Sequence, residues 1–136
     1  MADIRRVTDA FSVSPQISEQ DVEEIAAAGF KTIIVNRPDG EGGIEQPRMG
    51  SIRAKAETLG LAFVALPFSG APTPEIVERM GNILNEAPQP VLAYCRTGTR
   101  CITAWALTNA GQGMSQEIVD AAAAAGYDLT SIESLL

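Results

Sequence analysis

The chain has 136 residues, of which 46% are hydrophobic and 20% are charged. This length and balance are typical of one globular domain with its own core, and they exclude a disordered chain. Ten basic residues against seventeen acidic ones give a net charge of −7, which disfavours binding to nucleic acid or to an anionic membrane surface.

The chain contains no histidine and only two cysteines. The absence of histidine excludes a Ser-His-Asp or Cys-His catalytic pair and any metal site that uses histidine. Two cysteines cannot form a Cys₄ zinc site, so we expect neither a metal nor another cofactor. The sequence shows neither the apolar stretch of a secretory signal nor a membrane span of ~18 residues. We therefore expect a cytoplasmic protein.

The predicted elements alternate between short apolar strands and helices. In chain order they are strands at 4–7 and 11–13, a helix at 19–28 with Ser18 as its cap, a strand at 31–36, a helix at 48–59, a strand at 61–66, a helix from 73 to about 88, a strand at 90–94, a helix from about 100 to 110, a helix at 115–126 with Ser115 as its cap, and a last turn opened by a capping box at 130–133. This order predicts a single α/β domain over residues 1–136, with a mainly parallel sheet and helices on both faces.

Three predicted loops follow strands of this sheet, at 37–43, 67–71 and 95–100. In open parallel sheets, ligands bind beyond the carboxyl ends of the strands. We therefore expect these loops to meet at one edge of the sheet and to form the functional site there. The loop at 95–100 carries the clearest chemistry.

Cys95 lies directly after an apolar strand and just before a helix. Backbone N–H groups of residues 96–100, the helix N-terminus and two arginines would all lower the pKa of its thiol, because each favours the thiolate. We therefore predict that Cys95 and Arg100 are catalytic. The predicted anion-binding residues of this loop are Arg96, Thr97, Gly98 and Thr99. The competing interpretation is a buried cysteine that packs as a small hydrophobic residue.

Three stretches carry resemblances to known families. The segment Cys-Arg-Thr-Gly-Thr-Arg at 95–100 resembles the active loop of rhodanese-type sulfurtransferases. The segments at 14–16, 28–34 and 36–38 resemble dual-specificity cysteine phosphatases. Along nearly its whole length the chain is similar to the bacterial phosphatase-like domain of beta-lactamase hydrolase-like proteins, mainly on residues 37–41, 93–100 and 125–129.

Members of that family occur alone or joined to a persulfide-dioxygenase-like domain, and the family is described both as phosphatase-like and as sulfurtransferase. The resemblance implies a fold like that of dual-specificity phosphatases and a contact of Arg37 with an anionic substrate. It also implies a persulfide dioxygenase as a partner.

The motif departs from that of a cysteine phosphatase in two ways. Phosphatases have histidine before the nucleophile and arginine six positions after it, whereas Tyr94 and Cys101 occupy those positions here and the arginine is Arg100. They also use an Asp general acid, and no Asp lies between 39 and 95. A shorter loop without that acid suits a single sulfur atom better than a phosphoryl group.

We therefore predict a rhodanese-like sulfurtransferase, in which Cys95 carries a sulfane sulfur taken from a small anionic or persulfide donor. The alternative is a phosphomonoesterase with a Cys95 phosphoenzyme, with Glu41 or Asp39 as the substitute acid. A third hypothesis is a thiol redox sensor that uses Cys95 and Cys101. We expect the Cys101 side chain to pack against the sheet and to point away from the Cys95 loop.

Overall fold

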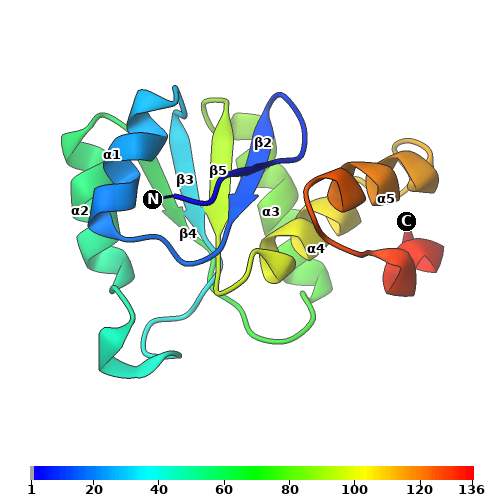
Figure 1. Cartoon of the computed structure of the whole chain (residues 1–136). Coiled ribbons are helices and arrows are strands. Elements are labelled where there is room, and N and C mark those ends of the chain that lie inside the picture. Colours follow the sequence, from blue (N-terminus) through cyan, green and yellow to red (C-terminus); the bar gives the residue numbers. More distant parts are fainter. Residues whose placement is uncertain (1) are drawn as a thin grey trace.

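A five-stranded sheet with one antiparallel edge lies at the centre of the computed structural model, which describes residues 2–136 (Figure 1). The strand order is β1-β2-β5-β3-β4, and every pair except β1 with β2 is parallel. The strands are β1 (Arg5–Arg6), β2 (Phe11–Ser14), β3 (Thr32–Val35), β4 (Ala62–Ala65) and β5 (Val91–Tyr94). The predicted α/β class with a mainly parallel sheet is therefore confirmed.

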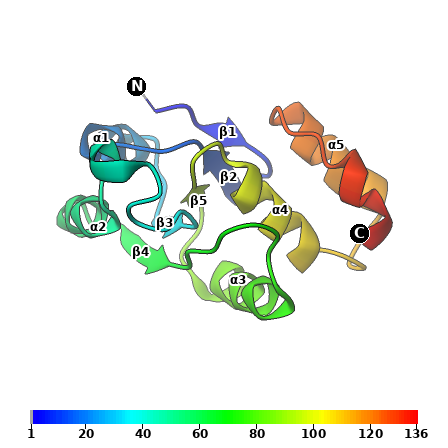
Figure 2. The same cartoon turned by 90° about the horizontal axis from the view of Figure 1, so that it is seen from below.

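The helices cover both faces of the sheet (Figure 2). Helices α1 (Glu19–Ala27) and α2 (Met49–Thr58) pack on one face, while α3 (Pro74–Glu86) and α4 (Thr99–Thr108) pack on the other. Helix α5 (Ser115–Ala124) packs outside α4, and two short 3₁₀ helices, η1 (Gly43–Glu45) and η2 (Thr130–Leu135), lie in loops. None of the helices in residues 2–136 combines the length and the apolar character needed to cross a bilayer.

The central strands are buried on both faces, which explains their nearly continuous apolar sequences. Alternate residues of each strand face opposite layers of helices. In β3, Ile33 packs with the α1 and α2 layer, whereas Ile34 packs with the α3 and α4 layer. Each face of the sheet therefore has its own hydrophobic core.

Two helix starts follow the sequence signals, and two do not. Ser18 is the N-cap of α1, as predicted, and it forms a capping box with Asp21 that stabilises the start of the helix. Thr73 caps α3. Ser115, predicted as a cap, is instead the first residue of α5, because the extended backbone ends at Met114. The capping box predicted at 130–133 does not form, because the Asp128 carboxylate accepts the Thr130 N–H and hydroxyl instead.

The four parallel strands end at the same edge of the sheet, and short backbone hydrogen bonds connect the loops that follow them. The Asn36 N–H donates to the Tyr94 carbonyl at 2.9 Å, and the Phe68 N–H donates to the Asn36 carbonyl at 3.1 Å. The Asn36 side-chain amide also donates to the Leu66 carbonyl at 2.9 Å. The three predicted loops therefore do meet at this edge.

Candidate functional site

The turn between β5 and α4 places Cys95 beneath the start of a helix. Gly98 is the N-cap of α4, with a φ of 93°, and its N–H donates to the Cys95 Sγ at 3.1 Å. The Tyr127 hydroxyl donates to the Thr97 carbonyl at 2.8 Å, and a Cβ added at Gly98 would overlap that hydroxyl. Glycine is therefore required at position 98 both for its backbone conformation and for space.

The Cys95 thiol has a pKa lowered to about 5. A hydrogen bond from the Cys101 thiol contributes most to this lowering, and the N–H groups of Cys101, Thr97 and Gly98 add to it, while burial acts in the opposite direction. The thiolate is thus the main form of Cys95 at neutral pH, and the thiolate is the nucleophilic form of cysteine.

The Cys101 side chain packs in the buried core against the sheet, as expected. The expectation that it points away from the Cys95 loop is wrong, because its thiol donates to Cys95. Position 101 lies in the first turn of α4, which follows directly on the turn that holds Cys95, and from there its thiol contacts the Cys95 sulfur. Burial raises the pKa of the Cys101 thiol well above its ordinary value, which keeps it protonated and able to donate.

Arg100 lies in the first turn of α4, and Glu41 occupies both arms of its guanidinium. Arg100 Nη2 donates to Glu41 Oε1 at 2.6 Å, Arg100 Nη1 donates to Glu41 Oε2 at 2.8 Å, and Nη1 also donates to the Phe68 carbonyl at 3.1 Å. The Arg100 guanidinium also interacts with the Cys95 thiolate. A fork of this kind binds planar or tetrahedral anions with two parallel hydrogen bonds.

Arg37 reaches the same carboxylate from the loop after β3. Its Nε donates to Glu41 Oε1 at 3.0 Å, and its Nη1 donates to Gln16 Oε1 at 3.1 Å. Arg37 is buried, with 8% of its surface exposed. Hydrogen bonds from Arg100 first, and then from Arg37, lower the pKa of the Glu41 carboxyl to about 2 against the opposing effect of burial. Two cations and one anion therefore form a compact cluster beside Cys95.

The remaining predicted loop residues are exposed. The Arg96 side chain points to solvent, and its guanidinium is not among the groups that lower the pKa of Cys95. The Thr97 hydroxyl donates to the Thr99 hydroxyl at 3.0 Å, and both residues are exposed. The structure therefore brings Cys95, Arg100 and Arg37 together and leaves Arg96 at the rim.

The sequence did not predict the contacts that three residues make in this site. Gln16 orients Arg37, Tyr127 holds the loop backbone from the far end of the chain, and Glu41 joins the two arginines. The position of Glu41, in a glycine-rich loop directly after a central strand, is the sequence feature that could have indicated its place in the site. Tyr127 gave no comparable signal, because its contact joins residues that are 30 positions apart.

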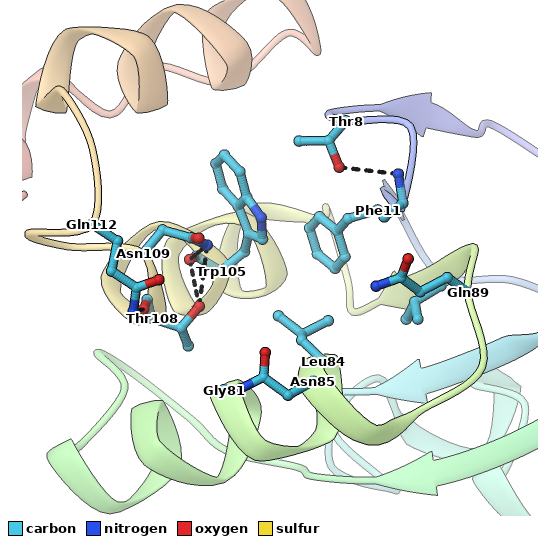
Figure 3. Close-up of a pocket in the computed structure, with 12 residues that line it drawn as sticks. Thr8, Phe11, Gly81, Leu84, Asn85, Gln89, Trp105, Thr108, Asn109 and Gln112 are labelled. Atoms are coloured by element: carbon cyan, nitrogen blue, oxygen red, sulfur yellow. Dashed lines mark hydrogen bonds between the residues drawn. The ribbon is translucent and has the colours of Figure 1, made fainter.

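A separate hollow of about 200 Å³ lies at the opposite end of the sheet (Figure 3). Phe11 and Val91, which line it, begin their strands, whereas Cys95 follows the end of β5. Trp105 stacks on Phe11 with ring centroids 5.9 Å apart. The hollow is thus remote from the thiol. Within residues 2–136, no group of three or more acidic, cysteine or histidine side chains is arranged to hold a metal ion.

Comparisons with known proteins point to one family. The model of the family described as beta-lactamase hydrolase-like protein, phosphatase-like domain, matches residues 3–112. A beta-lactamase hydrolase-like protein of Agrobacterium fabrum (strain C58) is 33% identical over 129 residues, which are 91% of this chain and 29% of that protein. A second such relative, from Xylella fastidiosa, is also covered over 29% of its length, so this chain spans less than a third of these curated relatives.

Solved structures agree with this family. The protein nma1982 of Neisseria meningitidis Z2491, described as a candidate phosphatase, is 38% identical with a TM-score of 0.86, over 96% of this chain and 94% of that one. Kinase associated phosphatase is 16% identical with a TM-score of 0.68, over 98% of this chain and 89% of that one. The second likeness shows a shared fold and confirms the predicted resemblance to dual-specificity phosphatases.

The prediction of a rhodanese-like sulfurtransferase is wrong. The matching family model and the similar structures are phosphatase-like, which favours the alternative that the sequence left open. Two of the departures from the phosphatase motif are compensated in the structure. Arg100 contacts Cys95 from the first turn of α4, and Glu41 brings a carboxyl group to the site, although no Asp lies between 39 and 95.

Proposed function

The chain belongs to the phosphatase-like domain family of beta-lactamase hydrolase-like proteins, and on this premise we propose that it is a phosphomonoesterase. In the proposed reaction the Cys95 thiolate attacks the phosphorus of a small anionic phosphate ester, the P–O bond to the ester's alcohol or phenol breaks, and a cysteinyl-phosphate forms. Water then releases inorganic phosphate and regenerates the thiolate.

One observation carries the proposal. A thiolate with a pKa of about 5 lies at the N-terminus of α4, and the Arg100 guanidinium interacts with it. Nucleophilic catalysis by cysteine requires an ionised thiol at neutral pH, and no histidine is available to deprotonate it. Hydrogen bonds from Cys101 and from the turn supply this ionisation instead.

The surroundings of Cys95 also suit the charge that develops on a transferring phosphoryl group. Phosphoryl transfer depends mainly on positioning and on donors aimed at the equatorial oxygens. The Arg100 fork offers two parallel donors, and the first turn of α4 adds the positive end of a helix. Arg37 supplies a second cation at the same edge.

The proposal is tested by steady-state hydrolysis of p-nitrophenyl phosphate. We expect turnover by the wild type, a loss of at least about a thousandfold in Cys95→Ser because the nucleophile is removed, and a loss of about a hundredfold in Arg100→Lys because the fork is removed. Arg79→Lys is the matched control, since Arg79 is exposed on α3, and we expect it to retain wild-type activity. Turnover that survives in Cys95→Ser, or its absence in the wild type, would overturn the proposal.

A further inference from the structure

The Glu41 carboxylate occupies the two arms of Arg100 that a substrate phosphate would need. The two oxygens of Glu41 accept from the two terminal nitrogens of Arg100 at 2.6 and 2.8 Å. Cys95 has no exposed surface in this arrangement. A substrate therefore reaches the thiolate only after neighbouring side chains move, and the phosphate must displace Glu41 from Arg100.

Glu41 is placed to make this movement. It lies in the loop between β3 and α2, flanked by Gly40 and Gly42, and its side chain is 29% exposed. The Arg37 Nε bond at 3.0 Å is a second attachment that does not depend on Arg100. When a phosphate takes the Arg100 fork, Glu41 can thus remain at the rim of the site, held by Arg37.

Displacement changes the protonation of Glu41. The hydrogen bonds from Arg100 are the main cause that lowers its pKa, and they are lost when the phosphate replaces the carboxylate. The arriving phosphate also places negative charge beside the carboxyl group, which raises its pKa further. Both changes raise the pKa of Glu41 against the lowering effect of the Arg37 hydrogen bond that remains. Glu41 is therefore able to hold a proton in the substrate complex, although it is ionised in the free protein.

The reaction needs such a proton. The oxygen that leaves phosphorus carries away an electron pair, and an alkoxide or a basic phenoxide leaves slowly unless it is protonated. Asp39 on the same loop is not free for this role, because its Oδ1 accepts the Met49 N–H at 2.8 Å at the start of α2. Among residues 2–136, Glu41 is the acidic residue that bonds to Arg100.

We propose that Glu41 is the catalytic acid that protonates the leaving oxygen, and that substrate phosphate releases it for this task by taking its place on Arg100. This role rests on the proposed phosphatase function. It extends the range of substrates to esters whose leaving groups are basic, such as alkyl and simple phenyl phosphates.

The reaction has two chemical steps, formation of the phosphoenzyme and its hydrolysis. The Cys95 thiolate forms the S–P bond while the P–O bond to the leaving group breaks, and the leaving oxygen takes the proton of Glu41. Water then attacks phosphorus, its proton passes to the Glu41 carboxylate, and the S–P bond breaks to restore the thiolate. Inorganic phosphate leaves, and Glu41 returns to Arg100 as it gives up its proton to solvent.

The test compares a good leaving group with a poor one in single-turnover formation of the phosphoenzyme. For Glu41→Gln we expect a loss of about a hundredfold or more with phenyl phosphate, and a loss at least about tenfold smaller with p-nitrophenyl phosphate, whose leaving group needs little protonation. Glu41→Asp keeps the acid and should recover part of the lost rate. Glu45→Gln is the matched control, because Glu45 is an exposed acid on the same loop.

Two other outcomes with Glu41→Gln would contradict the proposed role of Glu41. Equal losses with both esters would show that Glu41 acts structurally, and equal gains would show that it only competes with substrate for Arg100. Either result overturns the role of Glu41 but leaves the phosphatase function intact. If Glu41→Gln fails to fold, the role of Glu41 is tested in the wild type by measuring the rate of phosphoenzyme formation with a series of substituted phenyl phosphates. A weak dependence of rate on leaving-group basicity supports the acid, and a steep one contradicts it.

Discussion

At the scale of single residues, the contact between Cys101 and Cys95 determines how reactive the nucleophile is. The two thiols are buried in the same hydrophobic core, where an isolated thiolate would be unfavourable. The Cys101 thiol and N–H both donate to the Cys95 sulfur and compensate for this burial. We therefore expect Cys101 to act through Cys95, as a positioning residue.

This contact predicts how the ionisation of Cys95 responds to substitution at 101. The thiolate of the wild type should disappear as pH falls through about 5. Cys101→Ala should raise this midpoint by about one to two pH units, because a hydrogen bond to a charged group contributes about 1.5–3 kcal/mol. Cys101→Ser retains a donor and should lie between the two.

The measurement is the ultraviolet absorbance of the thiolate as a function of pH, with Cys95→Ser subtracted as background. An unchanged midpoint in Cys101→Ala would show that the turn N–H groups alone hold the thiolate.

The sequence pattern indicated Cys95 and Arg100 as the centre of the candidate site, but it did not indicate the details of their contacts. Cys95 and Arg100 were identifiable because a cysteine, a glycine and two arginines follow one another within six positions. The roles of Glu41 and Tyr127 depend on how loops from distant parts of the chain pack together, whereas the contact of Cys101 depends on how the first turn of α4 faces Cys95. The contacts of Glu41 and Tyr127 span up to 59 positions, and no local pattern encodes them.

At the scale of elements, the strand-turn-helix unit from β5 to α4 depends on Gly98. Gly98→Ala adds strain because φ is 93°, and it adds a collision with the Tyr127 hydroxyl, which supports the Thr97 carbonyl. We expect a loss of about 2–4 kcal/mol in the free energy of unfolding and a loss of about a hundredfold in phosphatase activity. Urea unfolding and the p-nitrophenyl phosphate assay measure the two effects.

Gly111→Ala is the matched control for the backbone strain that alanine causes at a positive φ. Gly111 also has a positive φ, of 77°, but a Cβ there meets no atom within 4 Å. It should therefore lose only about 1 kcal/mol of stability and no activity. Equal effects of the two substitutions would show that Tyr127 does not constrain the turn.

The helices and strands are predictable from the sequence where one strong local signal has no competing signal beside it. The buried strands, the Ser18 capping box and the Thr73 cap with Pro74 in the first turn are such cases. At 130–133 two local signals compete, and the Asp128 side chain takes the N–H that the predicted box would have used. The sequence pattern alone does not show which of two side chains accepts the hydrogen bond from the same N–H group.

At the scale of the whole molecule, parallel topology explains why an acidic protein can hold an anion. The net charge of −7 is spread over the surface, and its repulsion is screened beyond ~8 Å at physiological ionic strength. The strand order brings the loops after β3, β4 and β5 to one edge, where Arg37 and Arg100 lie side by side on Glu41. Two cations therefore gather at this edge, although the chain as a whole carries a negative charge.

The proposed function depends on covalent phosphorylation of Cys95 during turnover. The most direct test is intact-protein mass spectrometry of the wild type, quenched in acid within milliseconds of mixing with p-nitrophenyl phosphate. We predict a mass increase of one phosphoryl group, localised by fragmentation to Cys95 and absent from Cys95→Ser. Hydrolysis that proceeds with no covalent adduct, or an adduct on any other residue, would contradict it.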